Sequence, residues 1–225
     1  MKIWHISDSH TFHSQLNVPI VDMVIFSGDM SNPRELIQSE KECRDFIEWM
    51  GSLPIKHKLA TAGNHDLAIE RRRVTPSDFH SVGITYLEND YTEIEGFRIF
   101  GTPITPSFGE GWAFNKNRAK MNEIWEMVEP TTDILISHGP PLGILDITQN
   151  RNNDFEQCGD RSLLKHCMNS THKLVCFGHI HRFKDCINQG TMTLSGLDTI
   201  FSNGSVVEDG RFDKGVINNG NIINL

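Results

Sequence analysis

The sequence predicts a layered α/β fold in which two mixed β-sheets are flanked by helices. Short apolar runs alternate with a helical pattern in the first third of the chain, as in α/β proteins. Strand patterns joined by short turns follow in the middle, which indicates hairpins and therefore mixed rather than purely parallel sheets. Polar side chains stand directly after several strands, where α/β sheets carry their functional sites.

The first elements follow from apolar periodicity. Lys2–Ser7, Asp22–Ser27 and Lys58–Ala62 are short apolar runs that end in polar clusters, which is typical of buried strands. Between the second and third strands, apolar residues recur every three or four positions, which predicts a helix within Ser31–Gly51.

This helix has start and stop signals of its own. We expect Asn32 to cap it, with Pro33 at the first helical position and Glu35 completing a capping box. Gly51 is expected to end it.

The rest of the chain continues the alternation. Further strands are predicted at Ile84–Leu87, Tyr91–Glu95, Phe97–Gly101, Asp133–Ser137 and Lys173–Phe177, and helices at Lys116–Val128 and Asp160–Met168. Thr148–Gln157 is polar and predicts a loop, and the tail from Thr191 predicts short strands and turns. Since no repeat or linker divides the chain, we expect residues 1–225 to form a single domain.

Composition limits the possible partners. Hydrophobic residues make up 38% of the 225 positions, which suits a globular protein. The 21 basic and 29 acidic residues leave a net charge of −8, so neither an extended nucleic acid nor an anionic membrane is an expected partner. The same charge still permits a local cationic pocket.

The location is predicted from what the chain lacks. The first residues contain no long apolar run typical of a signal peptide, and no later stretch approaches the ~18 apolar residues of a membrane span. The five cysteines are odd in number and scattered, without a C-x-x-C pair, which favours reduced thiols. We therefore expect a cytoplasmic protein.

Side chains that bind divalent metals follow five of the predicted strands. They are Asp8 and His10, Asp29, Asn64 with His65 and Asp66, His138, and His179 with His181. Because the carboxyl ends of strands in an open α/β sheet lie at one rim, we expect these side chains to converge. A glycine or another small residue stands beside each group, which lets the backbone turn sharply.

The residue types suit two divalent ions. One ion would be held by Asp8, His10, Asp29 and His181, and the other by Asp29, Asn64, His138 and His179, with Asp29 bridging. Mixed carboxylate, imidazole and amide ligands favour Mn, Fe or Zn over calcium, and the absence of thiolate argues against structural zinc. We expect Mn, with Ni and Mg also open. Two ions roughly 3.5–4 Å apart would share a hydroxide that attacks a phosphoester.

The order of these motifs resembles the calcineurin-like metallophosphoesterase superfamily. The pattern D-x-H, G-D, G-N-H-D, H-G and G-H-x-H runs from residue 8 to residue 181. Three further segments are similar to the metallophosphoesterase-domain-containing subfamily, namely Trp49–Pro54, Gly96–Pro103 and His138–Gly143. The resemblance implies the calcineurin-like α/β-β/α sandwich and a phosphodiesterase acting on small or nucleotide-type substrates, with cyclic nucleotides among the candidates.

The resemblance also implies roles near the metals. It makes His65 the residue that protonates the leaving oxygen, oriented by Asp66, where the family more often has Glu. Asn32 and Arg182 are the nearest polar candidates for substrate contact.

Other functions stay open at this point. Phosphomonoesterases of the protein phosphatase type follow their G-D with D-R-G, whereas Met30–Arg34 follows Gly28-Asp29 here, which favours diesters. Nucleases of the superfamily usually carry additional DNA-binding or capping domains. A non-catalytic interaction scaffold would be expected to have lost ligands, and this chain keeps them all.

The remaining histidines and aromatic residues favour structural roles. His5 lies within the first strand, which indicates a buried histidine with hydrogen-bond partners, and His13 is undecided between packing and substrate contact. We expect solvated rings at His57, His80, His166 and His172, and an exposed helix face at Arg71–Arg73, with phosphate binding as the alternative. The aromatic residues of the Ser107–Asn115 loop are expected to pack in the fold or to form a wall beside a base or aryl group.

Overall fold

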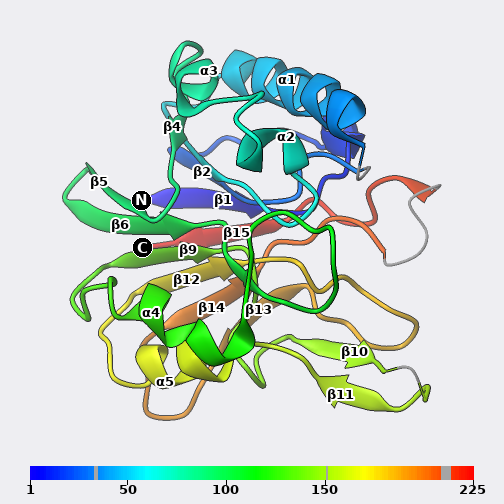
Figure 1. Cartoon of the computed structure of the whole chain (residues 1–225). Coiled ribbons are helices and arrows are strands. Elements are labelled where there is room, and N and C mark those ends of the chain that lie inside the picture. Colours follow the sequence, from blue (N-terminus) through cyan, green and yellow to red (C-terminus); the bar gives the residue numbers. More distant parts are fainter. Residues whose placement is uncertain (33–34, 151, 209–213) are drawn as a thin grey trace.

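The computed structural model describes residues 1–32, 35–150, 152–208 and 214–225 (Figure 1). In chain order its elements are β1 (Lys2–Ile6), η1 (Phe12–Gln15), β2 (Met23–Ser27), α1 (Leu36–Ser52), β3 (His57–Thr61), α2 (Leu67–Glu70), α3 (Pro76–His80), β4 (Thr85–Tyr86), β5 (Asp90–Ile94), β6 (Phe97–Thr102), β7 (Thr105–Pro106), β8 (Asn115–Lys116), η2 (Arg118–Lys120), α4 (Asn122–Trp125), β9 (Ile134–Ser137), β10 (Ile147–Gln149), β11 (Phe155–Gln157), α5 (Arg161–Cys167), β12 (Leu174–Phe177), β13 (Gly190–Thr193), β14 (Ile200–Asn203) and β15 (Asn221–Asn224).

Two large mixed sheets form the centre of the molecule. The first has the strand order β15-β1-β2-β3-β4, with β15 antiparallel to β1 and the others parallel. The second has the order β13-β14-β12-β9-β6-β5, with parallel central strands and antiparallel strands at both edges. Helices α1–α3 lie on the outer face of the first sheet, and α4 and α5 on that of the second (Figure 1). The predicted layered α/β sandwich is therefore confirmed.

Alternation along the strands builds three apolar layers. Ile3 and Ile25 face the second sheet, where they join Ile134 and Ile136 in a cluster between the sheets. Trp4, one residue further along β1, faces the helices instead. Because side chains alternate between the two faces of a strand, a strand that is apolar at every position must be covered on both sides.

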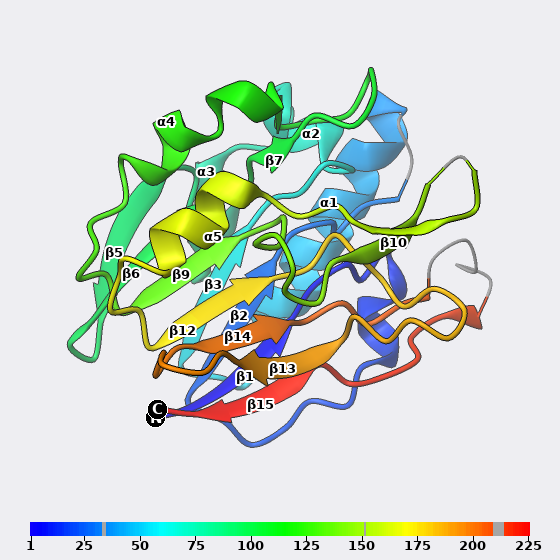
Figure 2. The ribbon, with the colours of Figure 1, turned by 90° about the horizontal axis from the view of Figure 1, so that it is seen from below.

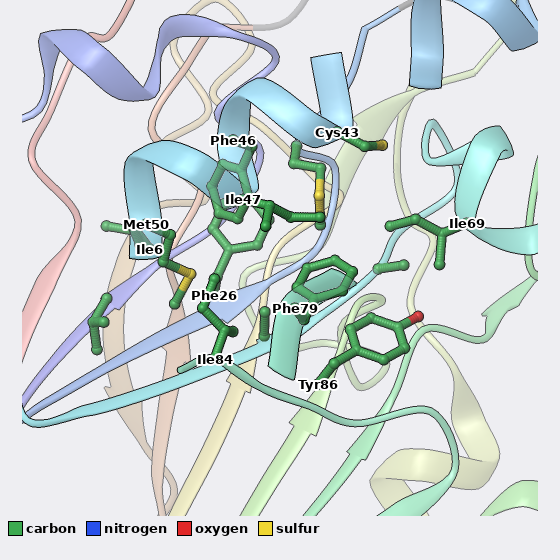
Figure 3. Packing of buried hydrophobic residues seen from close by; sticks show 14 of the residues in the cluster. Ile6, Phe26, Cys43, Phe46, Ile47, Met50, Ile69, Phe79, Ile84 and Tyr86 are labelled. Atoms are coloured by element: carbon green, nitrogen blue, oxygen red, sulfur yellow. The ribbon is translucent and has the colours of Figure 1, made fainter. Parts of the chain in front are cut away.

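Helix α1 covers the first sheet with one apolar stripe. Cys43, Phe46, Ile47 and Met50 recur at three- and four-residue spacing and are buried (Figure 3). The ring of Phe46 lies 4.3 Å from that of Phe26 on β2, measured between centroids. This packing holds the helix beside the strand that carries Asp29.

The start of α1 differs from the prediction. Glu35, not Asn32, is the N-cap, because its carboxylate accepts the N–H groups of Ile37 and Gln38. Pro33, predicted at the first helical position, lies outside the described residues. Gly51 does not end the helix, which continues to Ser52.

Two other predicted elements are corrected. The helix expected over Lys116–Val128 is reduced to η2 and the single turn of α4, because the chain first pairs as β7 and β8. The loop expected over Thr148–Gln157 is a hairpin, in which Ile147 pairs with Gln157 across β10 and β11. Neither β10 nor β11 has a buried apolar face, so their sequences lack the alternation of apolar and polar residues that predicts a strand.

The carboxyl ends of the central strands of both sheets open on the same side. Figure 2 shows the loops after β1, β12 and β14 on the same side of the molecule. Two hydrogen bonds join the sheets there, since the Ser7 N–H donates to the Gly204 carbonyl and the Val206 N–H donates to the Ser7 carbonyl. This edge is where the predicted metal ligands lie.

Candidate metal centre

Two clusters of ligand-type side chains meet at the rim of the sheets. Each combines residues of the two sheets, namely Asp8, His10 and His181 in the first cluster, and Asp29, His138 and His179 in the second. Within each cluster the ligand atoms all lie within 4.8 Å of one another, and His10, Asp29 and His65 form a third such group that joins the two clusters. The structure thus brings together residues that are up to 173 positions apart in the chain.

Asp29 lies between the two clusters. Its Oδ2 atom is 3.2 Å from His138 Nε2 and 3.9 Å from His10 Nε2. In the first cluster His181 Nε2 lies 3.0 Å from Asp8 Oδ1, and in the second the Asn64 Oδ1 atom lies 3.0 Å from His138 Nε2. Asp29 therefore has the position that the sequence analysis assigns to a bridging ligand.

Four of these residues have an unusual backbone conformation. Asp8, His10, Asp29 and His179 have φ angles of 54°, 41°, 61° and 67°, in the left-handed region that non-glycine residues rarely adopt. Such conformations cost about 1–3 kcal/mol each and persist only where the surroundings enforce them. Strain concentrated on four convergent ligands indicates a functional site.

Two glycines let the loops approach closely. A Cβ atom at Gly63 would lie 2.3 Å from Asp29 Oδ1, and one at Gly178 would lie 2.0 Å from Asp8 Oδ2. Any larger residue would displace the carboxylates. The small residues beside the ligands are thus required by space as well as by backbone turning.

The proton positions on two histidines fit metal binding. Nδ1 of His138 lies 2.8 Å from the Ser27 carbonyl, and Nδ1 of His10 lies 3.1 Å from the Ser31 carbonyl. A carbonyl only accepts, so both Nδ1 atoms carry the proton. Metal-binding histidines are oriented in this way, with the other ring nitrogen directed at the ion. Here His138 Nε2 faces Asp29, and His10 Nε2 lies 3.4 Å from His181 Nε2 and 3.9 Å from Asp29 Oδ2.

The charges of the cluster also favour a cation. Burial acts to raise the pKa of Asp8, but His181 outweighs it and lowers this pKa to about 2. Burial lowers the pKa of His10 and of His179 to about 3, so both rings are neutral at pH 7. Burial would also lower the pKa of His138, but Asp29 raises it to about 9. A proton between His138 and Asp29 therefore occupies a position for which a metal ion would compete.

His65 lies against the clusters but has a partner other than the predicted one. Its Nδ1 atom donates to the Asn32 carbonyl at 2.5 Å, and its Nε2 atom lies 3.9 Å from Asp29 Oδ2. The Asp66 carboxylate does not orient this ring. It accepts the N–H groups of Gly63 and of the segment 29–31 instead, at 2.8–3.4 Å. Asp66 therefore holds the loop that carries Asp29.

A cavity of about 270 Å³ opens above the clusters. Asp29, Asn64, His65, His179 and His181 line its polar side. Its other side is largely apolar, with Phe108, Trp112, Ile147, Ile180 and Phe183. The Trp112 ring lies 4.8 Å from the ring of His65, and the Phe108 ring lies 5.0 Å from that of His179. The 107–115 loop therefore forms a wall of the cavity, which is one of the two roles expected for its aromatic residues.

The two predicted substrate contacts lie elsewhere. Asn32 and Arg182 are not among the residues that line this cavity. The Asn32 carbonyl accepts the Nδ1 proton of His65, and Arg182 is exposed and pairs with Glu208 through the main chain in an isolated β-bridge. The apolar residues Ile147 and Phe183 were missed. Phe183 is only two positions after His181, but Ile147 gave no sequence signal because it belongs to the unrecognised hairpin.

The remaining histidines divide between confirmed and corrected predictions. His5 is buried and bonded to two serine hydroxyls, as expected, and His80 is exposed. His172 is buried rather than solvated, because its Nδ1 atom donates to the Thr132 carbonyl. The undecided His13 packs against Phe46 and Trp49 in α1, away from the cavity.

His166 and His57 are half-buried rather than solvated. Arg71–Arg73 are exposed and pair with surface carboxylates, but they follow α2, which ends at Glu70, and lie in a turn rather than on the expected helix face. All five cysteines are free thiols. Within the described residues, no helix combines the length and apolar character needed to cross a membrane.

The two-sheet sandwich and the paired Asp/His clusters at its rim define the class, that of the metallophosphoesterases. The family model of the calcineurin-like phosphoesterases matches residues 1–183. The chain belongs to that family.

Individual relatives agree with this assignment. Human metallophosphoesterase domain-containing protein 1 is 31% identical over 212 residues, which cover 84% of this chain and 63% of the human protein. The chain thus matches less than two thirds of that relative. One crystal structure shares the fold with a TM-score of 0.63 at 15% identity, over 99% of this chain and 97% of the other. The protein TT1561 of Thermus thermophilus gives 0.56 at 12% identity, over 90% and 88% of the two chains.

Proposed function

We propose that this chain is a metal-dependent phosphodiesterase for small diesters that carry an aryl or nucleoside group. The observation that carries the proposal is the pair of Asp/His clusters joined by Asp29 on the floor of a cavity with an apolar wall. Family membership supports hydrolysis of phosphoesters. The preference for diesters and for an aromatic group is inferred from the residues around the cavity.

The residues that would hold the two ions are those of the two clusters together with Asn64. Asp8, His10, Asp29 and His181 would bind one ion, and Asp29, Asn64, His138 and His179 the other. We propose Mn, since carboxylate, imidazole and amide ligands suit a borderline divalent ion. When bound, such ions polarise phosphate oxygens and lower the pKa of water, which makes a nucleophile available near neutral pH.

His65 supplies the proton for the leaving group. Its Nδ1 proton is engaged with the Asn32 carbonyl, so its Nε2 faces the reaction centre. As the oxygen of water bonds to phosphorus, the bond from phosphorus to the leaving oxygen breaks, and that oxygen takes the Nε2 proton of His65. The proton that the attacking water releases restores the protonated ring. The products are a phosphomonoester and an alcohol.

The cavity favours a single negative charge. No arginine or lysine of the described ranges lines it, so apart from His65, whose proton goes to the leaving group, no side-chain cation is available there to pair with the second charge of a monoester dianion. Two divalent ions, the two carboxylates Asp8 and Asp29 and one hydroxide would leave about +1. A diester carries one negative charge and matches this value. Protein phosphatase activity is disfavoured by the same argument.

The apolar wall suits a flat ring in the substrate. Phe108 and Trp112 lie 5.3 Å apart between ring centroids and border the cavity beside two histidines of the centre. Stacking on such rings contributes about 1–3 kcal/mol for a nucleobase. The cavity volume of about 270 Å³ fits a small ligand rather than a polymer, which disfavours a nuclease.

Metal removal tests the catalytic class. Protein treated with a chelator is expected to lose its activity on bis(4-nitrophenyl) phosphate and to regain it with Mn. A non-catalytic scaffold would be inactive with every metal. Full activity in excess chelator, with no metal detected by elemental analysis, would contradict the dinuclear centre.

A substrate panel tests the preference. We expect a higher kcat/KM for bis(4-nitrophenyl) phosphate and for a 2′,3′-cyclic nucleotide than for 4-nitrophenyl phosphate. A monoester preferred by about tenfold, which corresponds to about 1.4 kcal/mol in transition-state binding, would reverse the proposal.

A further inference from the structure

We propose that Glu42 of α1 is a positioning residue for His65, which it reaches through the main chain of Asn32. The inference rests on the proposed function, because it concerns the proton that His65 gives to the leaving group. Glu42 itself lies on the helix and does not line the cavity.

Two hydrogen bonds, linked by the backbone of Asn32, connect the two side chains. His65 Nδ1 donates to the Asn32 carbonyl at 2.5 Å. The N–H of the same residue, Asn32, donates to Glu42 Oε2 at 2.8 Å. Glu42 thus holds Asn32 from one side while Asn32 holds the His65 ring from the other.

Glu42 is itself fixed in place. Its second oxygen, Oε1, accepts the side-chain N–H of Gln38 at 2.9 Å, one helical turn earlier. Both oxygens of the carboxylate are therefore engaged. A bond from a main-chain N–H to a carboxylate is charge-assisted and about twice as strong as a neutral one. This bond gives the main chain at Asn32 a defined orientation, although the helix begins only at Leu36.

The orientation matters because the ring of His65 has little other side-chain support. Its ring contacts are with His10 at 4.6 Å and with Trp112 at 4.8 Å, measured between centroids, and neither contact holds Nδ1. The Asp66 carboxylate, the predicted partner, is engaged by main-chain N–H groups. The direction of the Nε2 atom toward the centre is therefore set by the Asn32 carbonyl, and the position of that carbonyl by Glu42.

The experiment compares two diesters, one whose leaving group departs without a proton and one whose leaving group must be protonated. Nitrophenolate leaves without protonation, as in bis(4-nitrophenyl) phosphate, whereas the alkoxide released from a 2′,3′-cyclic nucleotide requires it. Values of kcat and KM are measured for the metal-loaded wild type and for His65→Ala, Glu42→Ala and Glu42→Gln. Glu48→Ala is the matched control, because Glu48 is an exposed acid on the same helix.

The expected pattern is a loss that depends on the leaving group. Glu42→Ala should lower kcat on the cyclic nucleotide by about 10- to 100-fold, the range for partners that orient a functional side chain. Its KM and its activity on the nitrophenyl diester should change by no more than about twofold, because ground-state binding is not affected. Glu42→Gln should recover part of the loss, since its amide oxygen still accepts the Asn32 N–H. Glu48→Ala should match the wild type.

The outcomes separate this inference from the proposed function. Should His65→Ala show no dependence on the leaving group, the general acid of the proposed function is wrong. If His65→Ala shows this dependence, but Glu42→Ala lowers kcat equally on both substrates or leaves kcat unchanged on both, the positioning role is overturned. If Glu42→Ala does not fold, Gln38→Ala decides, because releasing Oε1 should give a smaller loss on the cyclic nucleotide alone. Equal kcat ratios for Gln38→Ala and the wild type would then overturn it.

Discussion

At the residue scale, main-chain carbonyls decide how the histidines of the centre present their nitrogens. Ser27, Ser31 and Asn32 each accept an Nδ1 proton, from His138, His10 and His65 respectively. Each acceptor lies on or just after β2, beside Asp29. One segment therefore provides both the central carboxylate and the groups that orient three rings around it.

The central position of Asp29 distinguishes it from His65. Asp29→Asn is expected to lower the occupancy of both metals, because Asp29 Oδ2 faces ligands of both clusters. His65→Ala should keep both ions and lower kcat by about 10²–10⁴-fold on alkyl diesters, the usual contribution of a general acid. Elemental analysis of both variants, beside kinetics, makes the comparison. Loss of both ions from His65→Ala would show that His65 is a ligand.

Proton competition at His138 predicts pH-dependent metal affinity. Asp29 raises the pKa of His138 to about 9 against the effect of burial, so the metal-free ring is protonated at pH 7. Binding must displace that proton. Affinity should therefore rise with pH, by about tenfold per unit for one proton, and level off near pH 9.

Titration calorimetry in buffers of different ionisation enthalpy measures the protons released by this step. His138→Gln should bind metal more weakly and with a flatter pH dependence. A wild-type affinity that is independent of pH between 6.5 and 8.5 would contradict the assignment.

At the scale of elements, the site depends on how closely the loops after β12 and β1 approach each other. Gly178 directly follows β12, and the space a Cβ would occupy there is filled by Asp8 Oδ2 and by Ser7 Oγ at 2.1 Å. Both neighbours belong to the loop after β1. The sheets can bring their ligands together only because one of these two strand ends has no side chain.

Gly178→Ala should disrupt the first cluster selectively. The added methyl group must displace Asp8, which overpacks the junction at a cost of about 1–3 kcal/mol and weakens metal binding. Gly139→Ala is the control, since glycine follows the ligand His138 there and the nearest atom to a Cβ is Thr105 Cγ2 at an ordinary 3.4 Å. Metal content and urea denaturation distinguish the two. Equal metal content in both variants would show that the junction relaxes.

At the scale of the whole molecule, a buried histidine joins the two sheets. His5 of β1 bonds to Ser27 Oγ on β2 at 2.9 Å and to Ser202 Oγ on β14 at 2.7 Å. Burial lowers its pKa to about 3, partly opposed by Asp8. The ring is therefore neutral in the folded protein, and the polar contact it makes lies within an otherwise apolar layer.

Linkage predicts how this histidine affects stability. Between pH 6.5 and about 3 the unfolded chain binds a proton at His5 that the folded protein does not. Stability should fall in that range as pH decreases, by about 1.4 kcal/mol per unit for one such group. Urea denaturation of metal-free wild type and His5→Gln at pH 7.5 and 5.5 measures the difference, with His80→Gln as an exposed control.

The variant His5→Gln is expected to lose less stability on acidification than the wild type, because it has no ring to protonate. The His80→Gln control should follow the wild type. Equal losses in all three proteins would mean that His5 does not control the acid response.

Prediction of the fold succeeded where a residue pattern has one physical meaning. Apolar runs such as those of β1, β2 and β12 are buried on both faces, so they identify strands without reference to the rest of the chain. It failed for α4 and for the β10–β11 hairpin. The single turn of α4 packs against residues distant in the sequence, and the hairpin strands are largely exposed. The local sequence therefore carries little of the energy that selects either conformation.

The sequence alone determined the layered α/β fold, the family and the set of candidate metal ligands that converge at the rim, because strand ends and glycines locate them independently of tertiary detail. Only the tertiary structure decided which groups orient those residues. The partner of His65 is a main-chain carbonyl of Asn32, and the partners of Asp66 are main-chain N–H groups. Every residue carries these peptide groups, so no amino-acid pattern can mark them. The folded arrangement of segments alone selects which of them are used.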